Sequence, residues 1–414
     1  MNLSQPSVGE VGVIALSPDP WSAQWMDRHY LLSRLAGYFQ VVWMTQPSWQ
    51  ETLSAVGSRG LSPEADAARP EGLQVYQPEL WLPQLGRPAW LARFTSQARL
   101  RRASNMLRAC GCTKIVLFIC RPEYGVAIED LPHDFSIYYV SDEYSFTTTE
   151  VEVSATERKV LGSVDQVYLT SPALMQKRGG FNPNTEFLPM GVDYQKFSTP
   201  VPEPDDLRAI PYPRVGYMGY LKRMLDWPLL LELSTAHPEW SFVFVGPRGP
   251  HPDIGNLLEK MSHLPNVHFL GGKPTKSLGA YPQHFDVCLM PYRIDDYTRY
   301  VYPLKMHEYL AGGKPVVSSP IRSVEDFKHV IALARNREEW SHAIEGALSA
   351  PENTLDQRAR RQRVARDYDW DGLVAKIVGA ITSGLGMDVP TAAVASTCEK
   401  SHDVVPGPID SLRG

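Results

Sequence analysis

Short, almost wholly apolar runs alternate along the chain with amphipathic stretches of about 10 to 15 residues. In the first half, six such runs have the length of buried β-strands, at 11–16, 41–45, 114–119, 136–140, 166–169 and 185–188. A more regular series follows at 214–218, 241–245, 267–270, 285–290 and 315–318. Strands that are apolar on both faces and separated by helices form parallel sheets with helices on each side. The pattern therefore predicts an α/β protein with two Rossmann-like, doubly wound domains facing a cleft.

Breaks in this pattern divide the chain. Residues 198–213 contain five prolines, which exclude a continuous helix or a central strand, so we interpret them as a linker. It separates an N-terminal domain (1–197) from a C-terminal domain (214–350). Residues 351–385 are expected to form helices that pack back across the cleft. Residues 386–414 lack aromatic side chains and periodicity, which predicts a disordered tail.

Composition excludes several function classes. The 414 residues are 43% apolar with a formal net charge of -5, which is unfavourable for wholesale nucleic-acid binding. No apolar run is long enough to cross a membrane, and the start does not resemble a secretory signal, so we expect a cytoplasmic protein. Five cysteines without a Cys-x-x-Cys spacing favour neither a disulfide framework nor a thiolate zinc site.

The most informative segment is PLKMHEYLAGGKPVVSS, residues 303–319. Pro303 and Leu304 suit the start of a helix, and two adjacent glycines suit its end. The N-terminus of such a helix attracts anions. Lys305 adds a full positive charge against a diphosphate, while Glu308 offers acceptor oxygens to a sugar diol. An exposed ion pair between Lys305 and Glu308, three residues apart, explains the same pattern equally well.

Other candidates follow the ends of predicted strands, where ligands of open α/β sheets bind. Asp19 and Trp21 come after the first strand, and Trp21 offers an aromatic face to a sugar. His29 lies on the helix that follows, where a structural role is the simpler interpretation. Asp142 and Glu143 come directly after the fourth strand. Asp142 is the leading candidate for an acid or base on the acceptor side, although a helix-capping role remains open.

Residues 85–114 carry seven basic side chains and no Asp or Glu. With aromatic residues at its start, this stretch suits contact with an anionic membrane surface. The cations that would make this contact are Arg93, Arg99, Arg101, Arg102 and Arg108. Because they are spread around the predicted helix, a simply solvated helix is the other interpretation.

Three strings in the sequence together resemble a known family. They are PLKMHEYLAGGKPVV, VGYMGYLKRMLDW at 215–227 and LPMGVDYQKF at 188–197. The combination is similar to the retaining GT-B glycosyltransferases of the group 1, or family 4, class, over about residues 11–381. The resemblance implies a nucleoside diphosphate sugar held by the C-terminal domain and an acceptor approached from the N-terminal one. It also implies no obligatory metal or other cofactor.

The resemblance also implies roles for single residues. The second member of the family's Glu, seven residues, Glu motif falls on Glu308, which would bind the ribose. The first falls on Tyr300, so a phenol replaces a carboxylate that would meet the donor sugar. Relatives often place an arginine and a lysine after the first strand of the second domain, but this chain does not. Lys222 and Arg223 in that loop are therefore our candidates for the diphosphate charge. Further donor-side candidates are Gly219, Gly246, Gly272 and Thr298, with Pro303 and Leu304 at the helix start.

These observations predict a glycosyltransferase acting on a glycan or lipid-linked hydroxyl in polysaccharide or glycoconjugate biosynthesis. Lys305, Arg223 and Lys222 would stabilise the leaving diphosphate, and retention is implied by the resemblance. In an inverting reaction, Asp142 or His29 would have to serve as the general base. A nucleotide-sugar-binding protein without transfer activity, and a sugar-nucleotide epimerase or phosphorylase, are the alternatives. The donor sugar, base, acceptor, linkage and oligomeric state stay open.

Overall fold

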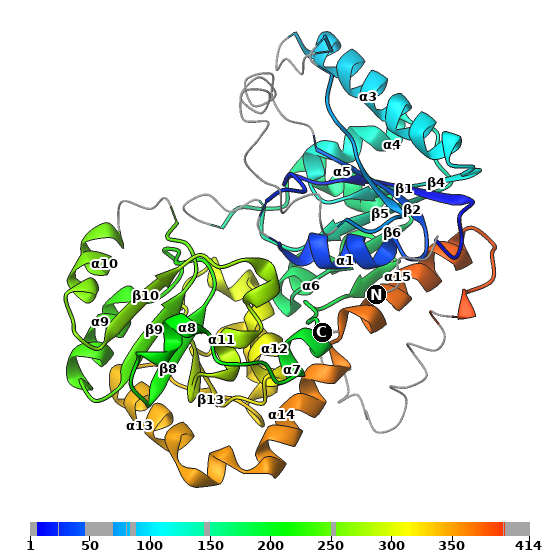
Figure 1. Ribbon diagram of the computed structural model, residues 1–414. Coiled ribbons are helices and arrows are strands. Elements are labelled where there is room, and N and C mark those ends of the chain that lie inside the picture. The colour runs from blue at the N-terminus through cyan, green and yellow to red at the C-terminus, as the bar shows by residue number, and fades with distance from the viewer. Residues whose placement is uncertain are drawn as a thin grey trace.

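The computed structural model describes residues 6–23, 25–45, 69–79, 81–82, 88–144, 150–249, 254–391 and 393. Within these ranges the chain forms two parallel β-sheets, each covered by helices on both faces (Figure 1). The predicted fold class is confirmed. No helix in the described part of the chain combines the length and apolar character that a membrane span requires.

The first sheet has seven parallel strands in the order β3-β2-β1-β4-β5-β6-β7. Every residue of β1, an interior strand, is buried, which explains why the sequence shows a continuous apolar run there. The strands are β1 (Val11–Leu16), β2 (Gln40–Met44), β3 (Leu73–Val75), β4 (Lys114–Ile119), β5 (Phe135–Val140), β6 (Gln166–Leu169) and β7 (Thr185–Phe187).

Two helices of the same half begin at side chains that cap their free N–H groups. Ser154 accepts from Glu157 N ahead of α5, and Ser171 accepts from Leu174 N ahead of α6. The helices of this half are α1 (Asp27–Leu35), α3 (Ala89–Ala109), η1 (Pro122–Val126), α4 (Ala127–Asp130), α5 (Ala155–Ser163), α6 (Pro172–Arg178) and η2 (Gly179–Phe181).

The second sheet has six parallel strands in the order β10-β9-β8-β11-β12-β13. They are β8 (Arg214–Met218), β9 (Ser241–Val245), β10 (Val267–Gly271), β11 (Val287–Met290), β12 (Val316–Ser318) and β13 (Ala332–Leu333). Around them lie α9 (Trp227–Ala236), α10 (Gly255–Ser262), η4 (Thr275–Ser277), α11 (Ala280–Gln283), η5 (Thr298–Tyr300), α12 (Leu304–Ala311), η6 (Arg322–Phe327) and α13 (Arg337–Leu348).

The remaining elements connect the two halves: α7 (Tyr194–Ser198), α8 (Asp205–Arg208), η7 (Ala350–Asn353), α14 (Leu355–Asp367) and α15 (Trp370–Gly384). The predicted linker contains only the four-residue helix α8, in keeping with its prolines. Helix α14 packs on α12, and α15 returns to the first half, where it packs on α1 (Figure 1). Trp370 stacks on Tyr30 there, with ring centroids 6.2 Å apart. The predicted return of the C-terminal helices is therefore confirmed.

All eleven predicted strands are present, with ends displaced by at most two residues. The sequence missed β3 and β13, edge strands of three and two residues, because runs this short show no periodicity. Of the predicted disordered tail, the structure describes 386–391 and 393; the other positions lie outside the described residues.

Candidate functional site

Helix α12 carries the first part of the candidate site. The helix begins at Leu304 with Pro303 as its N-cap residue and is followed by Gly312 and then Gly313, at φ +70°, so its predicted start and stop are confirmed. Lys305 lies in its first turn, and its Nζ donates to the hydroxyl of Tyr292 over 3.1 Å. Burial alone would lower the pKa of Lys305, but the nearby phenols of Tyr217 and Tyr292 outweigh burial and raise it. The amine therefore stays charged at neutral pH.

Two glycines bring the ends of β8 and β9 against Lys305. Gly219 and Gly246 have φ of +146° and +145°, a region that favours glycine. A Cβ on Gly246 would lie 2.0 Å from the Gly219 oxygen, and one on Gly219 would lie 2.9 Å from Lys305 Cε. The two loops thus approach backbone to backbone, with the lysine packed against them. Gly246 N also donates to Gly271 O over 2.9 Å, which places the neighbouring Gly272 near the same sheet end.

Glu308 lies one turn beyond Lys305. The structure shows no ion pair within 4.0 Å between them, so the surface-pair interpretation does not hold. Within the described residues, the Glu308 carboxylate has no hydrogen-bond donor. Burial raises its pKa, and the positive charges of Lys305 and Lys196 oppose that rise. A half-buried carboxylate and a half-buried ammonium thus lie on consecutive turns without neutralising each other by direct contact.

The loop after β8 supplies two more cations. Burial lowers the pKa of Lys222, and the nearby charge of Lys305 lowers it further, while Asp142 and Asp19 act in the opposite direction. Lys222 therefore lies between the lysine of α12 and two acids of the N-terminal half. Arg223 is exposed, and no ion pair to it occurs in the described part of the chain. Like-charged groups held close together and not engaged in direct ion pairs favour an anionic ligand.

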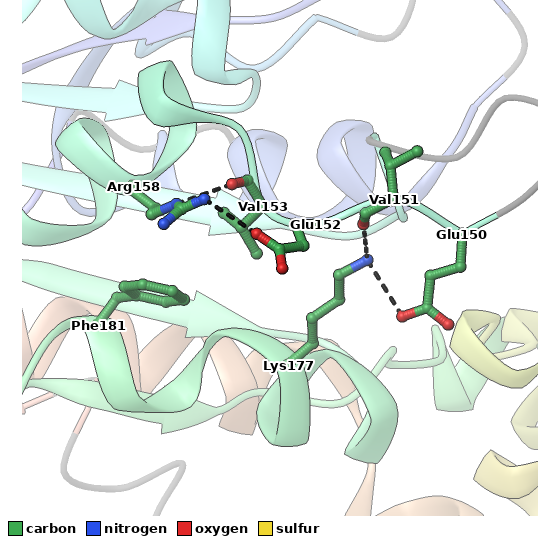
Figure 2. Close-up of a pocket in the computed structure, with 7 residues that line it drawn as sticks. All are labelled: Glu150, Val151, Glu152, Val153, Arg158, Lys177 and Phe181. Carbon is green, nitrogen blue, oxygen red and sulfur yellow. Dashed lines mark hydrogen bonds and ion pairs between the residues drawn. The ribbon is translucent and has the colours of Figure 1, made fainter.

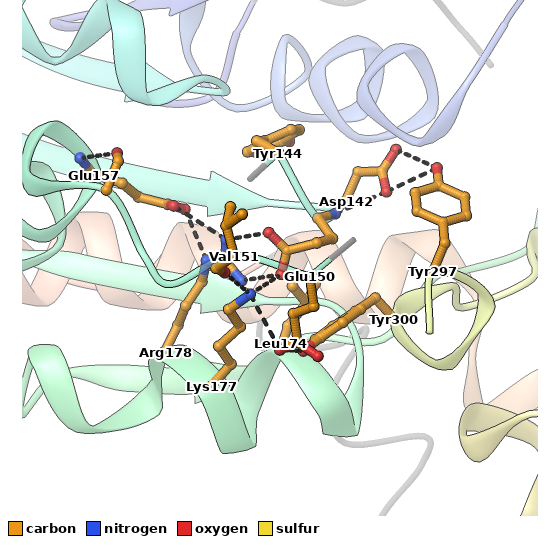
Figure 3. A network of polar contacts seen from close by, with 12 residues as sticks. Asp142, Tyr144, Glu150, Val151, Glu157, Leu174, Lys177, Arg178, Tyr297 and Tyr300 are labelled. Atoms are coloured by element: carbon orange, nitrogen blue, oxygen red, sulfur yellow. Dashed lines mark hydrogen bonds and ion pairs between the residues drawn. The ribbon is translucent and has the colours of Figure 1, made fainter. Parts of the chain in front are cut away.

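The segment 291–302, which we call the donor loop, uses its polar groups differently. The Thr298 hydroxyl donates to Arg293 O over 2.6 Å and accepts from Asp295 N, so it stabilises the loop itself. Tyr300 donates its hydroxyl to Glu150 of the N-terminal half (Figure 3). The phenol that replaces the family's carboxylate is thus a contact between the two halves.

Two acids of the N-terminal half extend toward the donor loop and Lys222. Asp19 is ion-paired with Arg28, which also donates to Ser141 over 2.9 Å. Arg28 thereby fixes the loop after β1 and the loop after β5 together. Asp142 accepts from the Tyr297 hydroxyl, which is 3.2 Å from each carboxylate oxygen, and from Glu143 N. Burial raises the pKa of Asp142, and these two hydrogen bonds oppose the rise.

Three other predicted acceptor-side residues lie in the core instead. Trp21 is 6% exposed, His29 is fully buried, and both pack with Trp43. The His29 Nδ1 accepts from Met26 N, and burial lowers its pKa, so it is a neutral structural residue and does not reach the cleft. The Glu143 side chain is buried in ion pairs and holds the polypeptide behind Asp142. Strand-end position alone did not distinguish Asp142 from its neighbour.

The basic side chains of helix α3 are less exposed and less free than the sequence suggested. Arg99 is buried and donates to Leu82 O, while Arg93 pairs with Asp130 and Arg102 with Glu79. Arg108 donates to Thr113 O over 2.7 Å. Only Arg101, among these five, is an exposed cation without a polar partner in the described residues. Acids from other elements pair with two of these cations and backbone carbonyls bind two more, which the sequence of the helix could not show.

Close to Glu150 the surface contains an open pocket of about 540 Å³ (Figure 2). Its lining combines apolar Val151, Val153 and Phe181 with Arg158 and Lys177, whose charges are paired with Glu152 and Glu150. The pocket therefore has no free cation, unlike the α12 site. Across the described ranges, no three His, Cys, Asp or Glu side chains gather as a metal site would require.

Comparison with known proteins identifies the C-terminal half. Residues 213–350 match the model of a family described as glycosyl transferases group 1. TuaH of Bacillus subtilis (strain 168), described as a teichuronic acid biosynthesis glycosyltransferase, is 31% identical over 198 residues, or 45% of this chain. The chain spans about half, 48%, of the length of that relative.

Solved structures match nearly the whole chain. Sucrose-phosphate synthase from Thermosynechococcus elongatus has a TM-score of 0.65 at 18% identity, covering 92% of this chain and 99% of that one. The E. coli trehalose-6-phosphate structure bound with UDP-2-fluoro glucose scores 0.63 at 13% identity, covering 92% and 100%. WaaG, a glycosyltransferase of lipopolysaccharide biosynthesis, scores 0.57 at 15% identity, covering 89% and 98%. These likenesses show the two-sheet GT-B fold. Residues 213–350 of this chain are thus similar to the group 1 glycosyl transferases, and the chain as a whole shares the fold of these solved structures.

Proposed function

We propose that this protein transfers a sugar from a nucleoside diphosphate sugar to a hydroxyl of a glycan or lipid-linked acceptor, in the assembly of a polysaccharide. The observation that carries the proposal is the pair Lys305 and Glu308 on consecutive turns of α12, both half-buried and not bonded to each other. A diphosphate beside Lys305 and a ribose beside Glu308 would satisfy both groups. The bound UDP-2-fluoro glucose of the E. coli structure and the name of TuaH support this donor and this pathway class.

The chemistry required of the protein is stabilisation of the leaving diphosphate. Lys305, Lys222 and the free N–H groups at the start of α12 supply positive charge before the bond breaks, so little reorganisation is needed. On the opposite side, Asp142, which accepts from the Tyr297 hydroxyl, would also accept a hydrogen bond from an acceptor hydroxyl. We propose retention of configuration, with the departing phosphate oxygen taking the proton, and transfer without a bound metal.

The proposal predicts nucleotide binding that depends on Glu308. In a thermal-shift screen with UDP, GDP, ADP, TDP and their sugar conjugates, one nucleotide family should raise Tm, because a ligand that binds only the folded state stabilises it by mass action. Glu308→Gln should weaken that binding by about tenfold or more, since a hydrogen bond to a charged group contributes roughly 1.5–3 kcal/mol. Titration calorimetry measures the affinity, with and without EDTA.

Glu259→Gln is the matched control, because Glu259 is an exposed acid on α10, far along the chain from α12. It should bind nucleotide like the wild type. A wild-type protein that no nucleoside diphosphate stabilises would contradict the donor site. Binding without transfer or hydrolysis would instead favour the binding-protein alternative, and interconversion of the sugar nucleotide would favour the epimerase.

We also propose that α3 places the N-terminal half on the cytoplasmic face of an anionic membrane, where a lipid-linked acceptor is found. Trp90 (71% exposed) and Phe94 (57% exposed) lie on the face of α3 opposite its buried residues, and Arg101 continues the same line at helical spacing. We call these three residues the α3 ridge. Exposed aromatic side chains next to an unpaired arginine suit the lipid headgroup region.

Vesicle sedimentation tests the α3 ridge. The full chain should bind phosphatidylcholine vesicles only when phosphatidylglycerol is added, and the double variant Trp90→Ser, Phe94→Ser should bind about a hundredfold more weakly, because burying each ring contributes roughly 1.5–3 kcal/mol. Leu355→Ser removes an exposed apolar side chain from α14 and should leave binding unchanged. Equal binding by the wild type and the double variant would contradict the proposal.

A further inference from the structure

Two tyrosines of the donor loop cross from the C-terminal half to acids of the N-terminal half (Figure 3). The Tyr297 hydroxyl is 3.2 Å from both carboxylate oxygens of Asp142. Three residues later, the Tyr300 hydroxyl donates to Glu150, and Arg299 pairs with the same carboxylate at 3.4 Å. Tyr300 is 1% exposed. Although it belongs to the C-terminal half, its side chain is part of an apolar cluster formed by residues of the first sheet and its helices.

The N-terminal side of this contact is rigidly supported. Arg178, fully buried at the end of α6, donates to both oxygens of Glu143 over 2.8 Å and also binds Glu157. Lys177 reaches Glu143 at 3.0 Å and Glu150 at 3.3 Å. Because Glu143 directly follows Asp142, this network fixes both acids that meet the tyrosines. A buried pair with all its hydrogen bonds formed holds one geometry.

The C-terminal side leads directly to the donor site. Tyr300 is five residues before Lys305, and only 301–303 separate η5 from α12. The Ser323 hydroxyl donates to Val301 O over 2.8 Å and so ties this short connection to the C-terminal half. The position of Lys305 relative to Asp142 therefore depends on where the donor loop meets the N-terminal half.

We propose that Tyr297 and Tyr300 are positioning residues that hold the cleft closed, an arrangement we call the tyrosine clamp. This inference rests on the proposed function, since it assigns the clamp the task of bringing the donor's diphosphate site and the acceptor-side acid to reacting distance. A small misplacement of the bound groups lowers the reaction rate by a large factor. The clamp also explains the phenol at position 300. A carboxylate there would face Glu150, and two like charges at that distance would push the halves apart.

Small-angle X-ray scattering of the full chain tests the clamp without any ligand. Tyr300→Phe removes only the hydroxyl, and Tyr300→Glu adds the repulsive charge. We expect the radius of gyration to rise in Tyr300→Phe and to rise further in Tyr300→Glu. Glu150→Gln, changed from the other side, should also raise it. Tyr302→Phe is the control, because the Tyr302 hydroxyl bonds His307 within the C-terminal half. Scattering profiles identical to wild type in all three test variants would overturn the proposal.

Kinetics separate the clamp from the proposed function. With a donor and acceptor pair that the wild type turns over, Tyr300→Phe should lower kcat about tenfold or more, while the Kd of the free nucleoside diphosphate stays within about twofold. A variant with unchanged kcat would refute the clamp and leave the transferase intact. Should the wild type bind no nucleotide, the proposed function fails, and the scattering result still decides whether the tyrosines hold the halves together.

Discussion

Replacing Lys305 by methionine should lower kcat/KM for sugar transfer by about a hundredfold to a thousandfold, the usual cost of removing one preorganised group that stabilises developing negative charge. Lys305 packs against the backbone of Gly219 and donates a hydrogen bond to the hydroxyl of Tyr292. Methionine keeps the length and much of the packing of the lysine stem and removes the charge. The measured loss therefore reports on electrostatics at the diphosphate.

Initial-rate kinetics on the purified variant measure this effect, and the Tm of each protein shows that the fold is retained. Lys276→Met is the matched control, because Lys276 is an exposed lysine of the same half, in η4. It should retain wild-type activity. Activity within about threefold of wild type in Lys305→Met would mean that the diphosphate is stabilised elsewhere, with Lys222 and Arg223 as the first groups to examine.

The second large effect concerns stability. Arg178→Met should lower the free energy of unfolding of the N-terminal half by about 3–5 kcal/mol, because it leaves charges buried without a partner. Glu143 and Glu157 are both fully or almost fully buried and both depend on this guanidinium. Arg178→Lys should restore little of this stability, since an ammonium cannot form the bidentate contact with Glu143 while also reaching Glu157.

Differential scanning calorimetry is the suitable measurement, since two halves can unfold in separate transitions. For a half of this size, the expected loss lowers the Tm of one transition by roughly 10 °C. Arg158→Met provides the comparison, because the Arg158 pair with Glu152 lies at the surface and exposed pairs contribute at most about 1 kcal/mol. Equal Tm values for the Arg178 and Arg158 variants would show that the buried network contributes little net stability.

Much of the fold could be read from local pattern. Both series of strands, the start and stop of α12 and the returning C-terminal helices depend on properties of short segments, such as the burial of β1 on both faces or the glycines after Ala311. The same holds for Lys305 and Glu308, because two residues three apart on one helix must lie on the same face. The spacing of two residues along one helix is a local property, so it can be predicted from the sequence.

The polar partners of other candidate residues lie far from them in the sequence and could not be predicted. His29 and Asp19 are ten residues apart, yet one is buried among aromatic rings and the other reaches toward the cleft. Glu143 is bound by Arg178, 35 positions further on, and Tyr297 meets Asp142 across 155 positions. A charge on a predicted helix can be neutralised by any acid that folding brings near, as Asp130 does for Arg93.

The two parallel sheets and the helix that carries Lys305 and Glu308 could be predicted from the sequence, because hydrophobic periodicity and helix capping act over a few residues. Which acids meet the C-terminal half, and that Tyr300 joins the two halves, became visible only in the tertiary structure. Electrostatic and hydrogen-bond partners depend on distances in space, and two segments far apart in the chain acquire such distances only when both sheets have folded and met.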